Sequence, residues 1–244
     1  MNALPTKHDE AWRYSDLAAL AAAWPVASEQ IVVAAGGSLV RHLIQSAASD
    51  ASAVHDFTIS VGAGARATFH VLNIGGKFGR VALNVTLHEG AHFELGAVQI
   101  GGAEQTLEIV TVVNHIEPNA TSNQVVRSVL GGSATGSYLG KVAVARDAQK
   151  TDAAQSVKAM LLTRTATANA KPELEIYADD VKCAHGASVG ELDQTALFYL
   201  ASRGLAPAEA QALLLEAFIA EVFDGAEAVE KLQTAARAAL EGLK

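Results

Sequence analysis

The sequence predicts a mainly β protein with helical segments at both ends, and three observations support this class. Between residues 31 and 177, short β-branched runs are separated by Gly, Asn and Asp, with no helical period over most of the stretch. Residues 61–71 (VGAGARATFHV) align with residues 87–97 (LHEGAHFELGA) at an offset of 26 residues. After Gly190 the apolar residues follow the 3.6-residue period of a helix.

Composition limits the functions open to this chain. Half of the 244 residues are hydrophobic and 18% are charged, which allows a large core and excludes a disordered protein. The net charge of −8, without a cluster of Lys and Arg, excludes a dedicated nucleic-acid binder. Neither apolar run, at residues 17–24 or 212–215, reaches the ~20 residues needed to cross a membrane. With a single cysteine and no signal-peptide pattern, we expect a cytoplasmic protein.

Three domains follow from these changes in pattern: a helical lead-in at residues 1–30, a β core at residues 31–190 and a helical domain at residues 191–244. In the lead-in, residues 8–24 predict a short helix. Either Ser15 or Asp16 is suited to cap it, and Pro25 is expected to end it.

The 26-residue repeat describes the β core. In both copies alternate residues are apolar, so each copy is expected to bury one face: Ala65, Ala67, Phe69 and Val71 in the first copy, and Ala91, Phe93, Leu95 and Ala97 in the second. Repeats of this length made of short strands are typical of a parallel β-helix, in which each coil covers its neighbour. An antiparallel sandwich alternates in the same way, so the pattern alone leaves both folds open.

The C-terminal domain has clear helix signals and a candidate partner surface. Asp193 is expected to cap one helix, Gly204 to follow its end, and Pro207 to begin the next. Residues 191–244 contain nine acidic and four basic side chains, so a partner here should offer positive charge around an apolar groove. The predicted partner-binding residues are Phe198, Leu214 and Phe218.

The segment His88-Glu89-Gly90-Ala91-His92 matches the HExxH motif of zinc peptidases. That motif binds zinc on a helix, where its two histidines lie one turn apart. Gly90 and the strand-like flanks instead favour an extended chain, which would place the two histidines about 13 Å apart, too far to share one ion. We therefore favour solvent-facing histidines and keep the peptidase as the alternative.

Cys183 and His185 form the second candidate metal site. On an extended strand their side chains leave the same face, about 7 Å apart, where a thiolate and an imidazole can share an inorganic ligand. The residues alone favour a small buried thiol and a structural histidine over a metal site. Beyond them, the strand must turn into the helical domain, and we expect Gly186 or Gly190 to have a positive φ.

Several motifs around this pair resemble one protein family. They are Glu10-Ala11-Trp12-Arg13-Tyr14, Ala148 to Ala153, Pro172 to Ile176, Asp179 to Cys183, His185 to Ala187, and Phe198 to Gly204. They resemble the SufB/SufD iron–sulfur cluster assembly proteins, and in particular the D-type subunit, with a shortened N-terminal region. The resemblance is good over residues 115–223 and implies a right-handed parallel β-helix as the core.

The resemblance also implies a function. The chain is expected to be a non-catalytic scaffold that pairs with a SufB-like subunit and docks a SufC-like ABC-type ATPase on its C-terminal helices. Cys183 and His185 match family positions implicated in holding a nascent iron–sulfur cluster where the two subunits meet. The cluster would be transient and shared with the partner, with no cofactor bound tightly to the isolated chain, which could also form a homodimer. The alternative is a stand-alone β-helix metalloprotein or zinc peptidase that uses residues 88–92.

Overall fold

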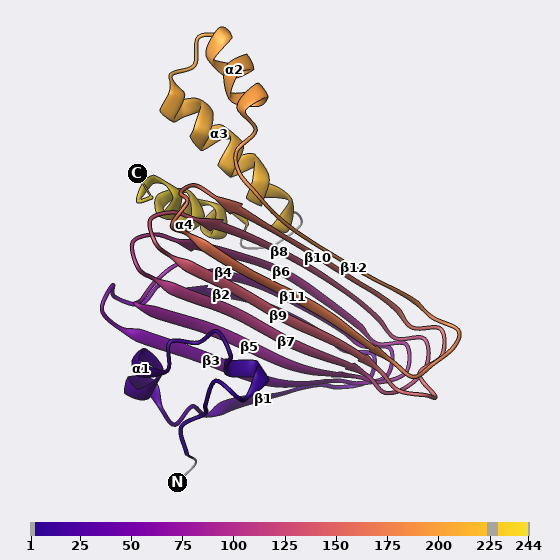
Figure 1. Cartoon of the computed structure of the whole chain (residues 1–244). Helices are drawn as coiled ribbons and strands as arrows, with labels where there is room; N and C mark the ends of the chain where they lie inside the picture. The colour runs from indigo at the N-terminus through magenta and orange to yellow at the C-terminus, as the bar shows by residue number, and fades with distance from the viewer. Residues whose placement is uncertain (1–2, 224–228, 244) are drawn as a thin grey trace.

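The computed structural model describes residues 3–223 and 229–243, and its core is a parallel β-helix (Figure 1). Successive strands alternate between two sheets, and each strand pairs in parallel with the strand two before it. The first sheet has six strands: β1 (Ser28–Val33), β3 (Ser52–Val61), β5 (Phe78–Leu87), β7 (Thr106–His115), β9 (Thr135–Val144) and β11 (Thr167–Ile176). The second also has six: β2 (Ser38–Gln45), β4 (Arg66–Asn73), β6 (His92–Gly101), β8 (Thr121–Leu130), β10 (Asp152–Leu161) and β12 (Lys182–Gly190). This topology confirms the β-helix and excludes the antiparallel sandwich.

The register explains why only one repeat is visible in the sequence. Arg66 pairs with His92, which is the predicted offset of 26 residues. The pairing of β3 with β5 has the same offset, since Ser52 pairs with Phe78. The other coils are longer: Ser28 pairs with Asp56 and Thr135 with Thr167, which are offsets of 28 and 32 residues. Because the coil length changes along the β-helix, no fixed period runs through the whole core.

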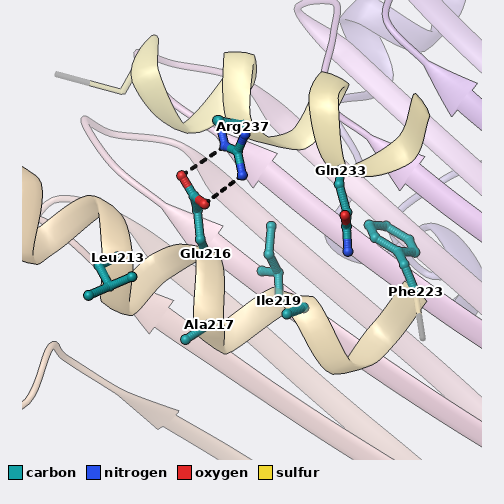
Figure 2. Close-up of a pocket in the computed structure, with 8 residues that line it drawn as sticks. Leu213, Glu216, Ala217, Ile219, Phe223, Gln233 and Arg237 are labelled. Atoms are coloured by element: carbon teal, nitrogen blue, oxygen red, sulfur yellow. Dashed lines mark hydrogen bonds and ion pairs between the residues drawn. The ribbon is translucent and has the colours of Figure 1, made fainter. Parts of the chain in front are cut away.

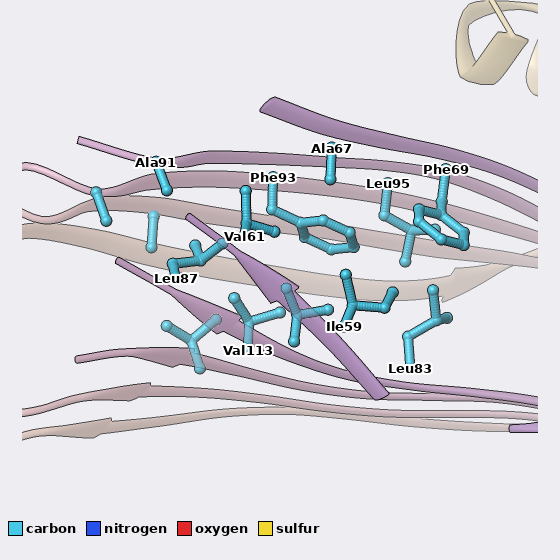
Figure 3. Close-up of a cluster of buried hydrophobic side chains, with 14 of the residues drawn as sticks. Ile59, Val61, Ala67, Phe69, Leu83, Leu87, Ala91, Phe93, Leu95 and Val113 are labelled. Carbon is cyan, nitrogen blue, oxygen red and sulfur yellow. The ribbon is translucent and has the colours of Figure 1, made fainter. Parts of the chain in front are cut away.

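The core lies between the two sheets, where alternate side chains of each strand point inward (Figure 3). The four inward residues predicted in each repeat copy are all fully buried. Aromatic rings meet inside this core: Phe57 contacts Phe69 across the two sheets edge to face, with ring centroids 5.9 Å apart, and Phe69 contacts Phe93 of the next coil at 6.3 Å. Burial of these side chains stabilises each coil against the next, at about 25 cal/mol per Å² of apolar surface.

The lead-in lies on the outer face of the first sheet. It consists of short turns, η1 (Glu10–Trp12), α1 (Leu17–Leu20) and η2 (Ala21–Ala23), in place of one continuous helix. Of the two predicted caps, Asp16 is the one that caps α1, since its side chain accepts a hydrogen bond from the Ala19 backbone N–H at 3.0 Å. Tyr14 packs against a small apolar cluster on β5, β7 and β9.

The C-terminal helices are α2 (Gln194–Ser202), α3 (Pro207–Ala220), η3 (Glu221–Phe223) and α4 (Val229–Glu241). Their predicted signals are confirmed. Asp193 accepts a hydrogen bond from the Thr195 backbone N–H at 2.8 Å, Gly204 has a φ of 94°, and Pro207 is the first residue of α3. Residues 224–228, between η3 and α4, lie outside the described residues.

A second core joins these helices to the outer face of the second sheet. Its members come from β4, β6 and β8 on one side and from α3, η3 and α4 on the other: Leu72, Val98, Ile100, Val129, Leu215, Ile219, Val222, Phe223, Leu232, Ala236 and Leu240. Arg127 of β8 adds a polar link, because its guanidinium donates to Glu221 of η3 and to the Ser156 carbonyl of β10. The second sheet is therefore buried on both faces over this region.

The prediction of a positive φ at Gly186 or Gly190 is wrong. Neither glycine is among the described residues with positive φ. Both belong to β12, which continues through Gly186 and ends at Gly190. The chain turns toward α2 only after the strand, and Asp193, the cap of α2, has an ordinary extended conformation. The turn therefore needs no left-handed residue.

Candidate functional site

The last strand, β12, carries the candidate site at an open end of the β-helix. It is the edge strand of the second sheet and pairs with β10 alone among the described residues. All of its residues are exposed except Cys183, which is half-buried. The first sheet ends beside it at β11 (Figure 1). The final coil thus exposes the free backbone edges of β11 and β12, together with the inward face of β12.

Cys183 and His185 lie on this inward face. They pair in register with Ala153 and Gln155 of β10, which are 2% and 3% exposed. Because alternate residues of parallel partners point the same way, both side chains project toward the interior of the coil. The structure therefore brings the thiol and the imidazole onto one face, with His185 more exposed than Cys183.

The Cys183 thiol packs against the edge of the main apolar core. Burial raises its pKa, a hydrogen bond with the Ala153 backbone opposes this, and the charge of Asp152 raises the pKa further. The thiol is therefore not activated as a nucleophile, since reactive cysteines have a depressed pKa. A metal that binds here would have to displace the thiol proton.

Two donors do not complete a metal site. Within the described part of the chain, no three His, Cys, Asp or Glu side chains gather closely enough to hold a metal ion. A thiolate and an imidazole are both known ligands of iron–sulfur clusters, which take four ligands in their common forms. The donor pair of Cys183 and His185 fits such a cluster only if further ligands come from another molecule.

A buried polar cluster lies beneath this strand and was not predicted from the sequence. It is formed by Thr111, Gln124, Tyr138 and Gln155, which are all at most 3% exposed. Thr111 Oγ1 donates to Gln124 Oε1 at 2.7 Å, Tyr138 Oη donates to the same oxygen at 3.1 Å, and Gln155 Nε2 donates to Tyr138 Oη at 3.2 Å. Full burial raises the pKa of Tyr138, so the phenol stays protonated.

Tyr138 fits inside the β-helix because Gly140 leaves space for it. A Cβ atom at Gly140 would lie 2.1 Å from Tyr138 Oη. In the next coil Pro172 pairs with Gly140, and His185 is the next residue in register after Gln155. The polar cluster therefore reaches the open end of the β-helix at the candidate site.

The zinc-peptidase alternative lacks its structural basis. His88, Glu89 and Gly90 form the turn between β5 and β6, in which Gly90 has a φ of 62°, and His92 begins β6. The two imidazoles have different partners, since His88 Nδ1 lies 3.1 Å from Glu117 Oε1 and His92 Nδ1 lies 2.7 Å from Thr121 Oγ1. The helix that would bring both onto one zinc ion does not form here.

The three predicted partner-binding residues have different environments. Phe198 of α2 is 75% exposed, beside Tyr199 at 56%. Leu214 of α3 is half-buried, and Phe218 packs against the second core. The three therefore do not form one exposed row, and Phe198 is the most exposed of them.

A groove between α3 and α4, missed by the sequence analysis, adds apolar surface on these helices (Figure 2). It has a cavity volume of about 250 Å³ and is lined by residues that include Leu213, Ile219, Phe223 and Gln233. Glu216 and Arg237 form a two-bond ion pair across it, with both N–O distances 3.0 Å. Leu213 at its rim is 49% exposed.

Comparison with known proteins assigns the family. Residues 14–218 match the family described as SUF system FeS cluster assembly, SufBD core domain. A SufBD-family iron–sulfur cluster assembly protein of Synechocystis is 34% identical over 173 residues, which are 70% of this chain and 38% of that protein. SufD of Escherichia coli is 32% identical over 159 residues, or 65% of this chain and 38% of that protein.

A plant relative extends the comparison. The chloroplastic protein ABCI7 of Arabidopsis thaliana is 36% identical over 155 residues, which are 63% of this chain and 33% of that protein. The match thus covers well under half the length of each of these relatives. No helix in residues 3–223 or 229–243 is long and apolar enough to cross a membrane. The family match covers most of the chain and agrees with the predicted resemblance, so this protein belongs to the SufBD family of iron–sulfur cluster assembly proteins.

Proposed function

We propose that this chain is a non-catalytic cytoplasmic scaffold subunit, similar to SufD, on which a nascent iron–sulfur cluster is held between two subunits. The observation that carries the proposal is the pair Cys183 and His185 on an edge strand at the open end of the β-helix. Two ligands on an accessible face need a second chain to complete a cluster site. The cluster is then cargo of the complex, with no cofactor bound tightly to the isolated subunit.

The second subunit is a SufB-like paralogue that meets this chain at its last coil. An edge strand has unpaired backbone N–H and C=O groups, which readily pair with a strand of another protein. Val189, also on β12, is 50% exposed and offers apolar surface beside the two ligands. In the absence of the paralogue, a second copy of the chain can occupy the same edge.

The ATPase partner is a SufC-like protein that docks on α2 and α3. Phe198 and Tyr199 expose large aromatic surfaces on α2, and exposed aromatic residues are frequent anchors of protein interfaces. The nine acidic side chains of residues 191–244 favour a partner with a basic rim. ATP-driven movement of this partner would act on the second sheet through the contacts of α3, η3 and α4.

Coexpression with a SufB-like paralogue and a SufC-like ATPase tests the proposal. We expect one complex that contains all three chains and retains iron and sulfide, while the chain purified alone retains little. Val189→Lys should reduce pairing with the paralogue and leave ATPase binding intact, since the two surfaces lie on different elements. A chain that binds neither partner, or that retains a full cluster alone, would contradict the proposed function.

A further inference from the structure

The buried side chain of Gln155 has one oxygen whose hydrogen-bonding partner is missing within the described chain. Gln155 is 3% exposed, and its Oε1 atom is buried without a partner. Its amide nitrogen is committed to Tyr138 Oη at 3.2 Å, which in turn is bonded within the Thr111 and Gln124 cluster. This bond orients the amide and turns Oε1 away from Tyr138. Gln124 Nε2, on the register neighbour in β8, is also buried without a partner among the described residues and does not bond to this oxygen. A buried acceptor left unpaired destabilises the fold.

The register identifies a donor. Along the inward face of the second sheet, Gln124, Gln155 and His185 follow one another in register on β8, β10 and β12. Gln124 lies one coil before Gln155 and is already hydrogen-bonded to Tyr138. His185 lies one coil after Gln155, in the last coil. Neighbouring strands lie about 4.8 Å apart, so an imidazole of β12 can reach an amide of β10. A neutral imidazole has one N–H to donate.

We propose that Gln155 is a positioning residue for His185: its Oε1 accepts the N–H of the imidazole and thereby fixes which ring nitrogen carries the proton. The other nitrogen is then bare and turned away from Gln155, toward the open end where Cys183 also lies. Metal-binding histidines commonly donate their second ring N–H to a neighbouring oxygen, which fixes the tautomer and the ring orientation. This inference rests on the proposed role of His185 as a ligand.

This role explains why polar side chains occupy the interior of the last coils. An apolar core would be sufficient to hold the coils together, as it does around Phe69 and Phe93. In the last coils, Tyr138 and Gln124 instead hold the Gln155 amide in one orientation. Gly140 keeps the necessary space, because any Cβ there would collide with Tyr138 Oη. Three coils of the β-helix thus contribute to the orientation of one exposed imidazole.

The test measures the His185 tautomer in the isolated chain without iron, at a pH above the ordinary histidine value of about 6.5. Long-range nitrogen–proton NMR spectra of chain labelled with ¹⁵N-histidine report the tautomer, and His185→Ala identifies the resonance. The ratio of the two tautomers should differ by at least about fivefold from that in an unstructured peptide spanning residues 180–190, as expected for a hydrogen bond of about 1 kcal/mol.

Two variants separate positioning from stability. Gln155→Met removes the acceptor at similar length and should return the ratio to that of the peptide. Gln124→Met alters the same buried network one coil further from the site, and should shift the ratio clearly less than Gln155→Met, because Tyr138 Oη can still accept from the Gln155 amide. A wild-type ratio equal to that of the peptide would overturn the proposal whether or not the variants fold, as would an equal effect of both variants, which would make Gln124 the partner of Gln155.

Failure of the proposed function and failure of this inference give different results. Failure of His185 as a ligand would appear as normal cluster content in complexes of His185→Ala, with the tautomer still fixed by Gln155. Failure of the positioning role would appear as a free tautomer ratio, with His185→Ala still losing the cluster. In coexpressed complexes, Gln155→Met should retain less iron than Gln124→Met. Equal iron content in these two complexes would contradict the role of Gln155.

Discussion

Arg80 and Glu108 form an ion pair with a distance of 2.5 Å between Nη1 and Oε2, and their side chains are only 3% and 1% exposed. The Trp12 ring lies over the guanidinium, with 3.7 Å between Arg80 Cζ and the ring centroid. Ser15 Oγ donates to the same carboxylate oxygen at 2.9 Å. Burial raises the pKa of Glu108, and the charge and hydrogen bond of Arg80 oppose this. The lead-in therefore covers a buried ion pair that joins β5 to β7.

Removal of one partner from this pair should be costly. Glu108→Leu leaves the Arg80 charge buried without compensation, and we expect a loss of about 3–5 kcal/mol in the free energy of unfolding. The matched control is Arg80→Met combined with Glu108→Leu, which removes both charges and should recover most of that loss. Urea denaturation measures both. Equal stability of the single and the double variant would show that the charges do not depend on one another.

Gly96 is required for the helices to dock on the second sheet. A Cβ atom there would lie 2.3 Å from the Val222 carbonyl oxygen of η3. Gly96→Ala should therefore displace η3 and destabilise the protein by about 1–3 kcal/mol. Gly186→Ala is the control, since nothing lies within 4 Å of its Cβ position and it should change stability by less than about 0.5 kcal/mol. Similar unfolding midpoints for the two variants would refute the packing argument.

His115 should make stability depend on pH. Its ring is fully buried, with Nε2 3.0 Å from Ser122 Oγ, and burial lowers its pKa from 6.5 to about 4. The folded protein therefore favours the neutral ring, while the unfolded chain gains a proton near pH 6.5. The stabilising contribution is complete above that pH, falls as pH decreases, and is lost by about pH 4. The full change is about 3 kcal/mol at about 1.36 kcal/mol per pKa unit.

Urea denaturation over this pH range, compared with His115→Gln, isolates the contribution of this residue. Buried His70 and half-buried His55 also make the protein less stable in acid, since burial lowers the pKa of both. The difference between wild type and His115→Gln should therefore shrink as pH falls from about 6.5 to about 4. A difference that stays constant across the range would show that His115 takes no part in the acid response.

Phe198 is the residue on which ATPase docking should depend most. We expect Phe198→Ala to weaken binding of a SufC-like ATPase by at least tenfold, because aromatic anchors carry much of the energy of an interface. Its melting temperature should not change, since the side chain is 75% exposed. Val32→Ala alters an 80% exposed residue of β1, at the opposite end of the β-helix, and should bind the ATPase normally. Equal binding by both variants would place the docking surface elsewhere.

Predictions that depend on residues close together in the sequence were more accurate than those that depend on residues far apart in it. Local signals such as the Asp193 cap and the Gly204 helix end were predicted correctly, because they depend on a few neighbouring residues. The two copies of the repeat were recognisable because Arg66 pairs with His92 without an insertion. The longer coils after them hide the same pattern.

The features that the sequence did not predict depend on residues from different coils. Whether Gln155 lies beside Tyr138 and His185 is decided by coil lengths, and those cannot be counted without the strand boundaries. The error at Gly186 and Gly190 has another origin, because the chain leaves β12 for α2 through Asp193 in an ordinary extended conformation and makes no left-handed turn at either glycine. Phe218 was assigned to a free surface since the helical period reveals an apolar face and does not reveal what covers it.

The central claim is that Cys183 and His185 hold a cluster shared with a second chain. Cys183→Ser replaces a soft thiolate by a poor ligand at nearly constant volume, and His185→Ala removes an exposed imidazole. Ser188→Ala is the control, since Ser188 pairs with exposed Lys158 on the outward face of the same strand.

The measurement is the iron content and the visible absorbance of each coexpressed complex, with the melting temperature of each variant as a check on folding. The account predicts that Cys183→Ser and His185→Ala assemble with their partners and melt normally but retain at least several-fold less cluster than wild type or Ser188→Ala. Normal cluster content in both ligand variants would contradict it.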